Sequence, residues 1–116
     1  MATDLVHKHC APCEGLRAAL PAEQAQRLSK QVPEWKLTAD GKRLRREWRV
    51  KDFQTALDFF GRIGAIAEQE DHHPDLHLTG YRNVVIEIST HAVGGLTEND
   101  FILAAKIDDV PVELKK

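Results

Sequence analysis

Two pairs of short alternating segments, each joined by a turn, constrain the fold of this chain more than any other feature. The segments 35–37 and 44–50 flank Asp40-Gly41, a dipeptide that predicts a type I′ turn. The segment 76–90 alternates in the same way around a turn that begins near Gly80. Because successive side chains of a strand point to opposite faces, each hairpin has one apolar face to cover. The sequence therefore predicts a β-sheet that is packed on one side.

Two stretches with helical spacing can supply part of that cover. Pro21 suits the first position of a short helix, which Pro33 ends. Asp52 can cap a longer helix that Pro74 prevents from continuing. The apolar stripe expected on the long helix comprises Phe53, Ala56, Leu57, Phe60, Ile63, Gly64 and Ala67.

A third helix is predicted near the end of the chain. Thr97 and Asp100 have the spacing of a capping box, and the helix reaches about Ile107. The order of elements is therefore α-β-β-α-β-β-α. We expect an α+β fold, a four-stranded antiparallel sheet with three helices on one face.

Length and composition indicate one soluble domain. A chain of 116 residues suits one core, and we divide it into an N-terminal arm, 1–20, and a single domain, 21–116. A net charge of -2 argues against nucleic acid or an anionic membrane as partner. The start of the chain has no apolar run typical of a signal peptide, and two cysteines, Cys10 and Cys13, make no disulfide framework. We expect a cytoplasmic protein.

Four of the six histidines lie between Glu68 and Asp100. Histidine can both give and take a proton near neutral pH, so a convergent set would suit proton transfer. Glu68 is four residues before His72 and could orient its ring on a helix. His91 ends the last strand on the face opposite its buried row. Both histidines could equally be solvated residues at the end of an element.

Other polar residues have competing interpretations. His77 has the polar-face parity of its strand, which favours a surface position, and Asp100 could serve the helix cap, the site or both. The segment 7–13 holds two histidines and a C-x-x-C pair, which could bind zinc, but the pattern favours a flexible, oxidisable arm. The basic strand 42–49 fits a solvated sheet face or a subunit interface better than a nucleic-acid stripe.

One ordered pattern of residues identifies a family. It comprises Glu68-x-x-x-His72-His73-Pro74, Tyr81, Ser89-Thr90-His91, Gly94-Gly95-Leu96-Thr97 and Asp100. With the Asp40-Gly41 hairpin and the Lys51-Asp52-Phe53 helix start, the chain resembles the pterin-4a-carbinolamine dehydratase family from about Pro21 to Ile107. The resemblance implies a four-stranded antiparallel sheet with three helices on one side.

The resemblance also implies an activity. Members remove water from 4a-hydroxytetrahydropterin, the product of aromatic amino acid hydroxylases, to give quinonoid dihydropterin and so recycle the pterin cofactor. They need no metal or organic cofactor, and they associate as homodimers or homotetramers. A hydroxylase is thus an expected partner.

Matching positions carry the expected roles. His72 and His91 would be the acid and base, in an order that the resemblance leaves open, and His73 would contact the pterin. The other substrate-binding residues expected from the resemblance are Glu68, Asp71, Ser89, Thr90, Ala92 and Asp100. The alternative is a non-enzymatic interaction module, a dimerisation cofactor or assembly factor, on the same fold.

Overall fold

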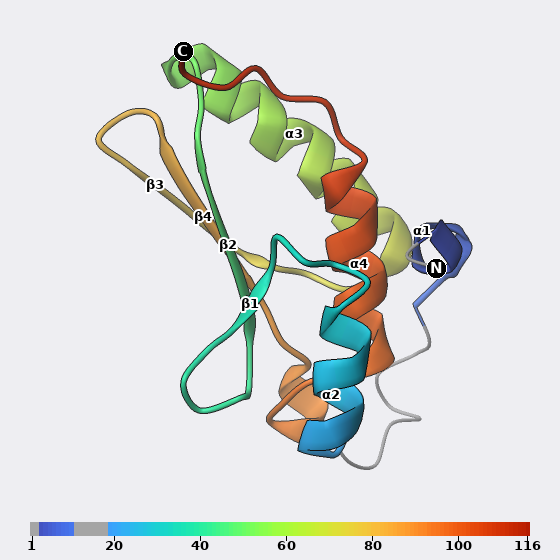
Figure 1. Cartoon of the computed structure of the whole chain (residues 1–116). Helices are drawn as coiled ribbons and strands as arrows, with labels where there is room; N and C mark the ends of the chain where they lie inside the picture. Colours follow the sequence, from blue (N-terminus) through green and yellow to red (C-terminus); the bar gives the residue numbers. More distant parts are fainter. Residues whose placement is uncertain (1–2, 11–18) are drawn as a thin grey trace.

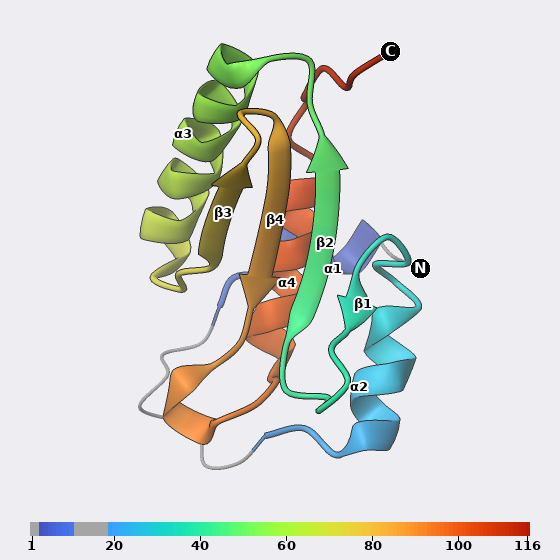
Figure 2. The same ribbon diagram turned by 90° about the vertical axis from the view of Figure 1, so that its left-hand side faces the viewer.

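One antiparallel sheet carries helices on a single face (Figure 1). The computed structural model describes residues 3–10 and 19–116. The strands are β1 (Lys36–Leu37), β2 (Leu44–Arg49), β3 (Asp75–Thr79) and β4 (Asn83–Ile88), and the helices are α1 (Thr3–His7), α2 (Ala22–Ser29), α3 (Phe53–Glu70), the one-turn 3-10 helix η2 (His91–Val93) and α4 (Glu98–Asp108). The spatial order of the strands is β1-β2-β4-β3, seen face-on in Figure 2. The predicted α+β fold is confirmed.

The two faces of the sheet differ as the alternation predicts. Val84, Ile86 and Ile88 of β4 are fully buried beneath the helices. On the other face, Arg43 and Arg45 of the first hairpin pair with Glu87 at 3.1 and 3.6 Å. The charged strand therefore forms a cross-strand ion-pair network on the open face.

Arg46 is the one charged residue on the helix-covered face of β2. Its guanidinium forms an ion pair with Asp108 at the end of α4 and lies 4.5 Å from the ring centroid of Trp48. A planar cation can stack on an indole while it binds a carboxylate, so arginine fits the rim of this apolar face.

The turn of the first hairpin differs from the predicted type I′ geometry. That turn requires positive φ at both central residues, but of Asp40 and Gly41 only Gly41 has it, at 69°. The amide of Gly41 instead donates to the carbonyl of Thr38, and Thr38 N donates to Arg43 O across a longer loop. The Asp40 carboxylate accepts hydrogen bonds from Thr38 Oγ1 and Lys42 N, which favours this wider turn.

The long helix α3 begins where predicted, because Asp52 accepts a hydrogen bond from Thr55 N at 2.8 Å. The expected apolar stripe was partly wrong. Phe53 and Leu57 are 50% and 42% exposed, whereas Phe59, which we did not include, is 1% exposed. The buried face follows the spacing of Ala56, Phe59, Ile63, Ala67 and Glu70. A stripe drawn too wide includes the solvent side of the helix.

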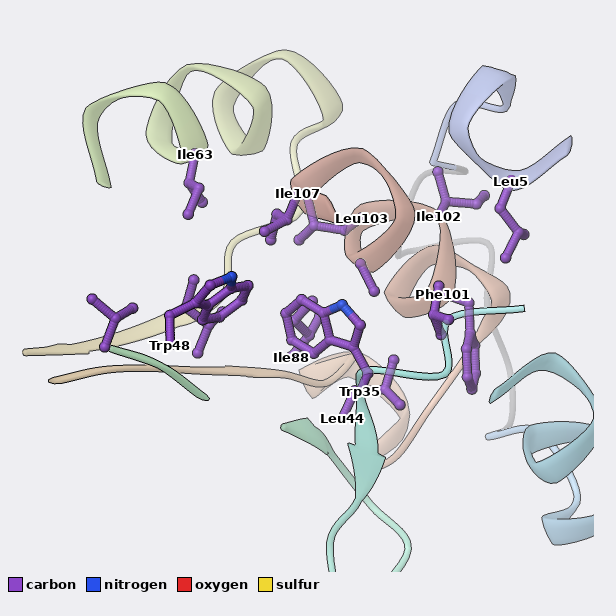
Figure 3. Close-up of a cluster of buried hydrophobic side chains, with 14 of the residues drawn as sticks. Leu5, Trp35, Leu44, Trp48, Ile63, Ile88, Phe101, Ile102, Leu103 and Ile107 are labelled. Carbon is purple, nitrogen blue, oxygen red and sulfur yellow. The ribbon is translucent and has the colours of Figure 1, made fainter. Parts of the chain in front are cut away.

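The core centres on aromatic side chains beneath α4 (Figure 3). Trp48 lies edge-on to both Trp35 and Phe59, with ring centroids 5.6 and 5.2 Å apart. Helix α4 contacts α1, α2, α3 and β2, so it is buried on nearly all sides.

The N-terminal helix α1 packs against α4 (Figure 1). Leu5 is 2% exposed and belongs to the core cluster. The sequence over these residues showed no periodicity, because a five-residue helix is too short to display one. Within the described ranges, no helix is both long and apolar enough to cross a membrane.

Candidate active site

A cavity of about 280 Å³ lies where the end of α3, the start of β3 and η2 meet. Figure 2 shows these three segments at the same end of the sheet. Its lining residues are Asp71, His72, His73, Pro74, Asp75, Ser89, His91 and Ala92. Six of the predicted catalytic and substrate-contacting residues therefore line one opening, although they come from two distant parts of the chain.

The end of α3 sets the position of His72. Asp71 takes the left-handed conformation, with φ 52°, and its amide donates to the carbonyls of Ala67 and Glu68. The amide of His72 also donates to Ala67 O, at 3.1 Å. This αL termination turns the chain sharply, so His72 leaves the helical path and its side chain is only 4% exposed.

His72 meets a buried carboxylate from α4. Its Nε2 lies 2.6 Å from Oδ1 of Asp100, whose side chain is fully buried. The other oxygen of Asp100, Oδ2, accepts hydrogen bonds from Thr97 N and from Thr90 Oγ1, each at 2.8 Å. The capping role predicted for Asp100 is confirmed, and the same carboxylate also holds a histidine of the cavity.

Glu68 pairs with His73 rather than orienting His72 as predicted. Its Oε2 lies 2.9 Å from Nε2 of His73, and both side chains are exposed. The expectation for His72 assumed that the helix continued through it, but the left-handed turn at Asp71 ends the i,i+4 geometry first. The partner of His72 is therefore Asp100, which is 28 residues further along the chain.

His91 opens η2 and is exposed on the wall of the cavity formed by residues 89–92. Ser89 and Ala92 line the same wall, whereas Thr90 is fully buried and points to Asp100. His77 is exposed on β3 and is not among the lining residues, so the surface position predicted for it is confirmed. The cavity thus joins one buried histidine with two exposed ones.

A second buried carboxylate, which the sequence analysis missed, lies just before the cavity. Glu70 accepts hydrogen bonds from Cys10 N at 2.7 Å and from His9 Nδ1 at 3.0 Å, with Lys106 Nζ 3.9 Å away. Burial tends to raise the pKa of this carboxyl, but these donors and the Lys106 charge outweigh it, so the pKa lies below its ordinary 4.5. The spacing from Ile63 and Ala67 could have indicated its burial.

We expect Glu70 to make the stability of the protein depend on acid pH. Because its folded-state pKa is lowered, its contribution is complete above the unfolded-state value and is lost as the pH falls through the folded-state value. Thermal melts from neutral pH to about pH 3 should therefore show a smaller loss of Tm in Glu70→Gln than in the wild type. Glu98→Gln, which removes the exposed pair with Lys8, is the control. Parallel curves for Glu70→Gln and the wild type would refute this role.

Cys10 is tied to the same cluster. Its Sγ lies 3.6 Å from the carbonyl oxygen of Asn99. Burial, followed by the negative charges of Glu70 and Asp100, raises the pKa of the Cys10 thiol from 9.0 to about 12. A thiol that resists ionisation is a poor nucleophile and metal ligand, which argues against the oxidisable arm expected at this residue. Cys13 lies outside the described residues, and among those described no group of three or more side chains is arranged to hold a metal ion.

Alkylation should measure this protection. In a Cys13→Ser variant, Cys10 is the single thiol. At about pH 8, a rise in pKa from 9.0 to 12 lowers the thiolate fraction by about a thousand-fold. Since a thiolate of higher pKa is also more nucleophilic, part of this loss is offset, and iodoacetamide should label native Cys10 at least about ten times more slowly than the urea-unfolded chain. Equal rates in the two states would show that Cys10 is not protected.

Comparisons with known proteins agree on one family. A family model described as pterin 4 alpha carbinolamine dehydratase matches residues 18–110. The Arabidopsis thaliana protein "Pterin-4-alpha-carbinolamine dehydratase 2, mitochondrial" is 56% identical over 114 residues, which are 95% of this chain and 60% of the plant protein. A Halorhodospira halophila protein named "Putative pterin-4-alpha-carbinolamine dehydratase" is 46% identical over 104 residues, which are 90% of this chain and 94% of the Halorhodospira protein.

One solved structure supports the same conclusion. The transcriptional coactivator/pterin dehydratase from Brucella melitensis matches with a TM-score of 0.72 and 28% identity, over 78% of this chain and 95% of that one. The cavity residues all fall inside the range of the family model, whereas α1 falls outside it. Helix α1 and the two residues that bind Glu70, His9 and Cys10, therefore lie outside the range that the family model matches.

Proposed function

Because this chain belongs to the pterin 4 alpha carbinolamine dehydratase family, we propose that it removes water from a 4a-hydroxytetrahydropterin to give the quinonoid dihydropterin. The C4a–O bond breaks, the C4a=N5 double bond forms and N5 loses its proton. One proton goes to the leaving hydroxyl and one comes from N5, so a paired acid and base suffice. An aromatic amino acid hydroxylase, whose reaction produces this carbinolamine, is the proposed supplier of the substrate.

The observation that carries the proposal is the meeting of His72, His73 and His91 at one cavity. Its volume of about 280 Å³ is near the lower end for small-molecule sites, which suits a compact ring system that stays partly exposed. His72 follows the end of α3 and His91 begins η2, so a flat ring bound in the cavity could exchange protons with both. We assign the acid and base roles to this pair.

The contact with Asp100 fixes one proton of His72. Its Nε2 lies 2.6 Å from the carboxylate, and an ionised carboxylate can only accept hydrogen bonds, so the shared proton belongs to Nε2. Asp100 fixes the tautomer, as the buried carboxylate of a hydrolytic triad does.

The exposed residues around the opening would hold the pterin. His73, with its ring braced by Glu68, would contact the substrate at the mouth, while Asp71, Ser89 and Ala92 form the adjacent walls. The hydroxyl of Thr90 does not face this space, because it binds Asp100. The residues proposed for binding thus surround the pair proposed for proton transfer, the buried His72 and the exposed His91.

Stopped-flow absorbance tests the proposal directly. Chemically generated 4a-hydroxytetrahydropterin decays on its own, and the protein should accelerate that decay. His77→Ala is the matched control, because it removes an exposed histidine that lies outside the cavity, and it should retain the full rate. If the wild type leaves the decay unchanged, the dehydratase assignment fails.

A second candidate function follows from the name of the Brucella melitensis relative, which is both transcriptional coactivator and pterin dehydratase. We therefore propose protein interaction on the same fold as the alternative to catalysis. The two are separable, because catalysis requires the cavity histidines and interaction requires an outer surface. No acceleration of pterin dehydration, together with stable binding of a protein partner, would favour this alternative.

We also propose that the chain forms a homodimer or homotetramer through the open edge of β3. Among the described residues this five-residue strand pairs only with β4, and Leu76 beside that edge is 37% exposed. The opposite edge, β1, has only two residues and offers much less backbone for pairing. Unpaired strand edges with apolar side chains favour association with another copy.

Sedimentation of a variant should show whether the β3 edge holds the oligomer together. Leu76→Lys places a charge where a partner would bury an apolar side chain, and loss of about 1.5–3 kcal/mol of burial should raise the dissociation constant about 10–100-fold. His77→Lys puts the same charge on the opposite face of the strand and should have a smaller effect. A wild type that sediments as a monomer at all concentrations would refute association.

A further inference from the structure

We propose that Thr90 is a positioning residue, whose hydroxyl fixes the Asp100 carboxylate and, through it, the ring of His72. This inference deepens the proposed function and rests on it for its catalytic meaning. The family resemblance suggested a substrate contact for Thr90, but its side chain is fully buried and faces away from the cavity wall formed by its neighbours. Its position in the chain, between the end of β4 and η2, places it directly behind His72 and Asp100.

The hydrogen bonds around Thr90 have one consistent direction. Its Oγ1 lies 2.8 Å from Oδ2 of Asp100 and 2.9 Å from Oγ1 of Thr97. A hydroxyl has a single hydrogen, and a carboxylate can only accept, so Thr90 donates to Asp100. Thr97 must then be the donor to Thr90. The result is a relay from Thr97 to Thr90 to Asp100, in which each bond polarises the next.

This relay determines the orientation of the carboxylate. Oδ2 receives two donors, the hydroxyl of Thr90 and the amide of Thr97, while Oδ1 is turned toward His72. The amide belongs to the N-cap of α4, whereas the hydroxyl comes from the segment between β4 and η2. Two donors from different segments restrain the carboxylate more tightly than the amide alone would, while His72 binds its other oxygen.

The backbone of Thr90 makes that contact rigid. Its amide donates to Gly95 O at 2.8 Å, and the two residues form an isolated antiparallel bridge. Its carbonyl accepts from Val93 N at 3.2 Å, which closes the turn of η2. Thr90 therefore links the wall that carries His91 with the carboxylate that holds His72. One residue sets the relative placement of the two proposed proton-transfer groups.

Nitrogen NMR of the histidines tests this role without any substrate. In the wild type, His72 should be the Nε2–H tautomer with a protected proton, because Asp100 binds that nitrogen. Thr90→Val keeps the shape and removes the hydroxyl, and it should weaken that protection and populate the other tautomer. Thr90→Ser keeps the hydroxyl and should restore the wild-type spectrum. If valine is not tolerated at this buried position, Thr90→Ala removes the hydroxyl without adding bulk.

Kinetics supply the second readout. Loss of groups that orient a ligating or catalytic histidine typically costs about 10–100-fold, so Thr90→Val should lower kcat at least about ten-fold with little change in KM. In an Asp100→Asn background the same substitution should have almost no further effect, since Thr90 acts through that carboxylate. A residue with a merely structural role would give additive losses and no change in tautomer.

The two proposals can fail separately. If the wild type does not dehydrate the pterin but Thr90→Val still shifts the tautomer of His72, the positioning role stands and the dehydratase assignment fails. If the wild type is active and a folded variant without the hydroxyl keeps the wild-type spectrum and kcat, the role of Thr90 is refuted.

Discussion

His72→Ala is expected to lower the rate of pterin dehydration by at least ten-fold, because a positioned proton-transfer group typically contributes about 10²–10⁴-fold. The loss should fall on kcat rather than KM, because the ring contributes in the transition state and is only 4% exposed in the free protein. His91→Ala should show a loss of the same order, since dehydration needs both an acid and a base.

The fold should survive the removal of His72. Asp100 keeps the amide of Thr97 and the hydroxyl of Thr90 as donors at Oδ2, so its helix cap remains. Circular dichroism of each variant separates a chemical loss from unfolding, and His77→Ala repeats the substitution outside the cavity. Wild-type rates in both His72→Ala and His91→Ala would mean that proton transfer does not depend on this pair.

Among the substitutions proposed for this protein, Phe59→Ala should lower the free energy of unfolding most, by about 3–5 kcal/mol. The ring is 1% exposed and meets Trp48 edge-on beneath α3, at a centroid distance of 5.2 Å. Truncation removes its apolar burial and leaves a cavity between helix and sheet, which the surrounding rings can fill only in part. Urea unfolding followed by tryptophan fluorescence measures the change in the midpoint at constant slope.

Phe53→Ala is the matched control, because the same truncation occurs on the same helix at a side chain that is 50% exposed. Surface substitutions of this kind usually change the free energy of unfolding by less than about 0.5 kcal/mol. Equal losses in the two variants would show that the buried face of α3 has been assigned incorrectly.

Local patterns predicted most of the elements. Alternation in 76–90 predicted the second hairpin, Asp52 marked the start of α3, and the Thr97/Asp100 box marked the start of α4. These signals lie within one turn or one strand, where backbone hydrogen bonding and side-chain period act directly. The patterns failed where contacts beyond the local segment set the structure. The turn type around Gly41 and the burial of Phe53 were both predicted wrongly.

Residue types at the site were predictable, but their partners were not. Sequence spacing paired Glu68 with His72. In the structure the chain turns at Asp71 in the left-handed conformation, and Glu68 pairs with His73 instead. The burial of Glu70 against Cys10 depends on a packing contact between segments about 60 residues apart, for which no local pattern exists.

By itself, the sequence indicated which residues are candidates for the site and near which helix and strand ends they lie, because those positions depend on local periodicity and capping. Only the tertiary structure decided that Asp100 is the carboxylate of His72 and that Thr90 stands behind it. The physical reason is that a buried hydrogen bond needs its two partners brought together by the packing of α3, α4 and the end of β4. Spacing along the chain does not encode that packing.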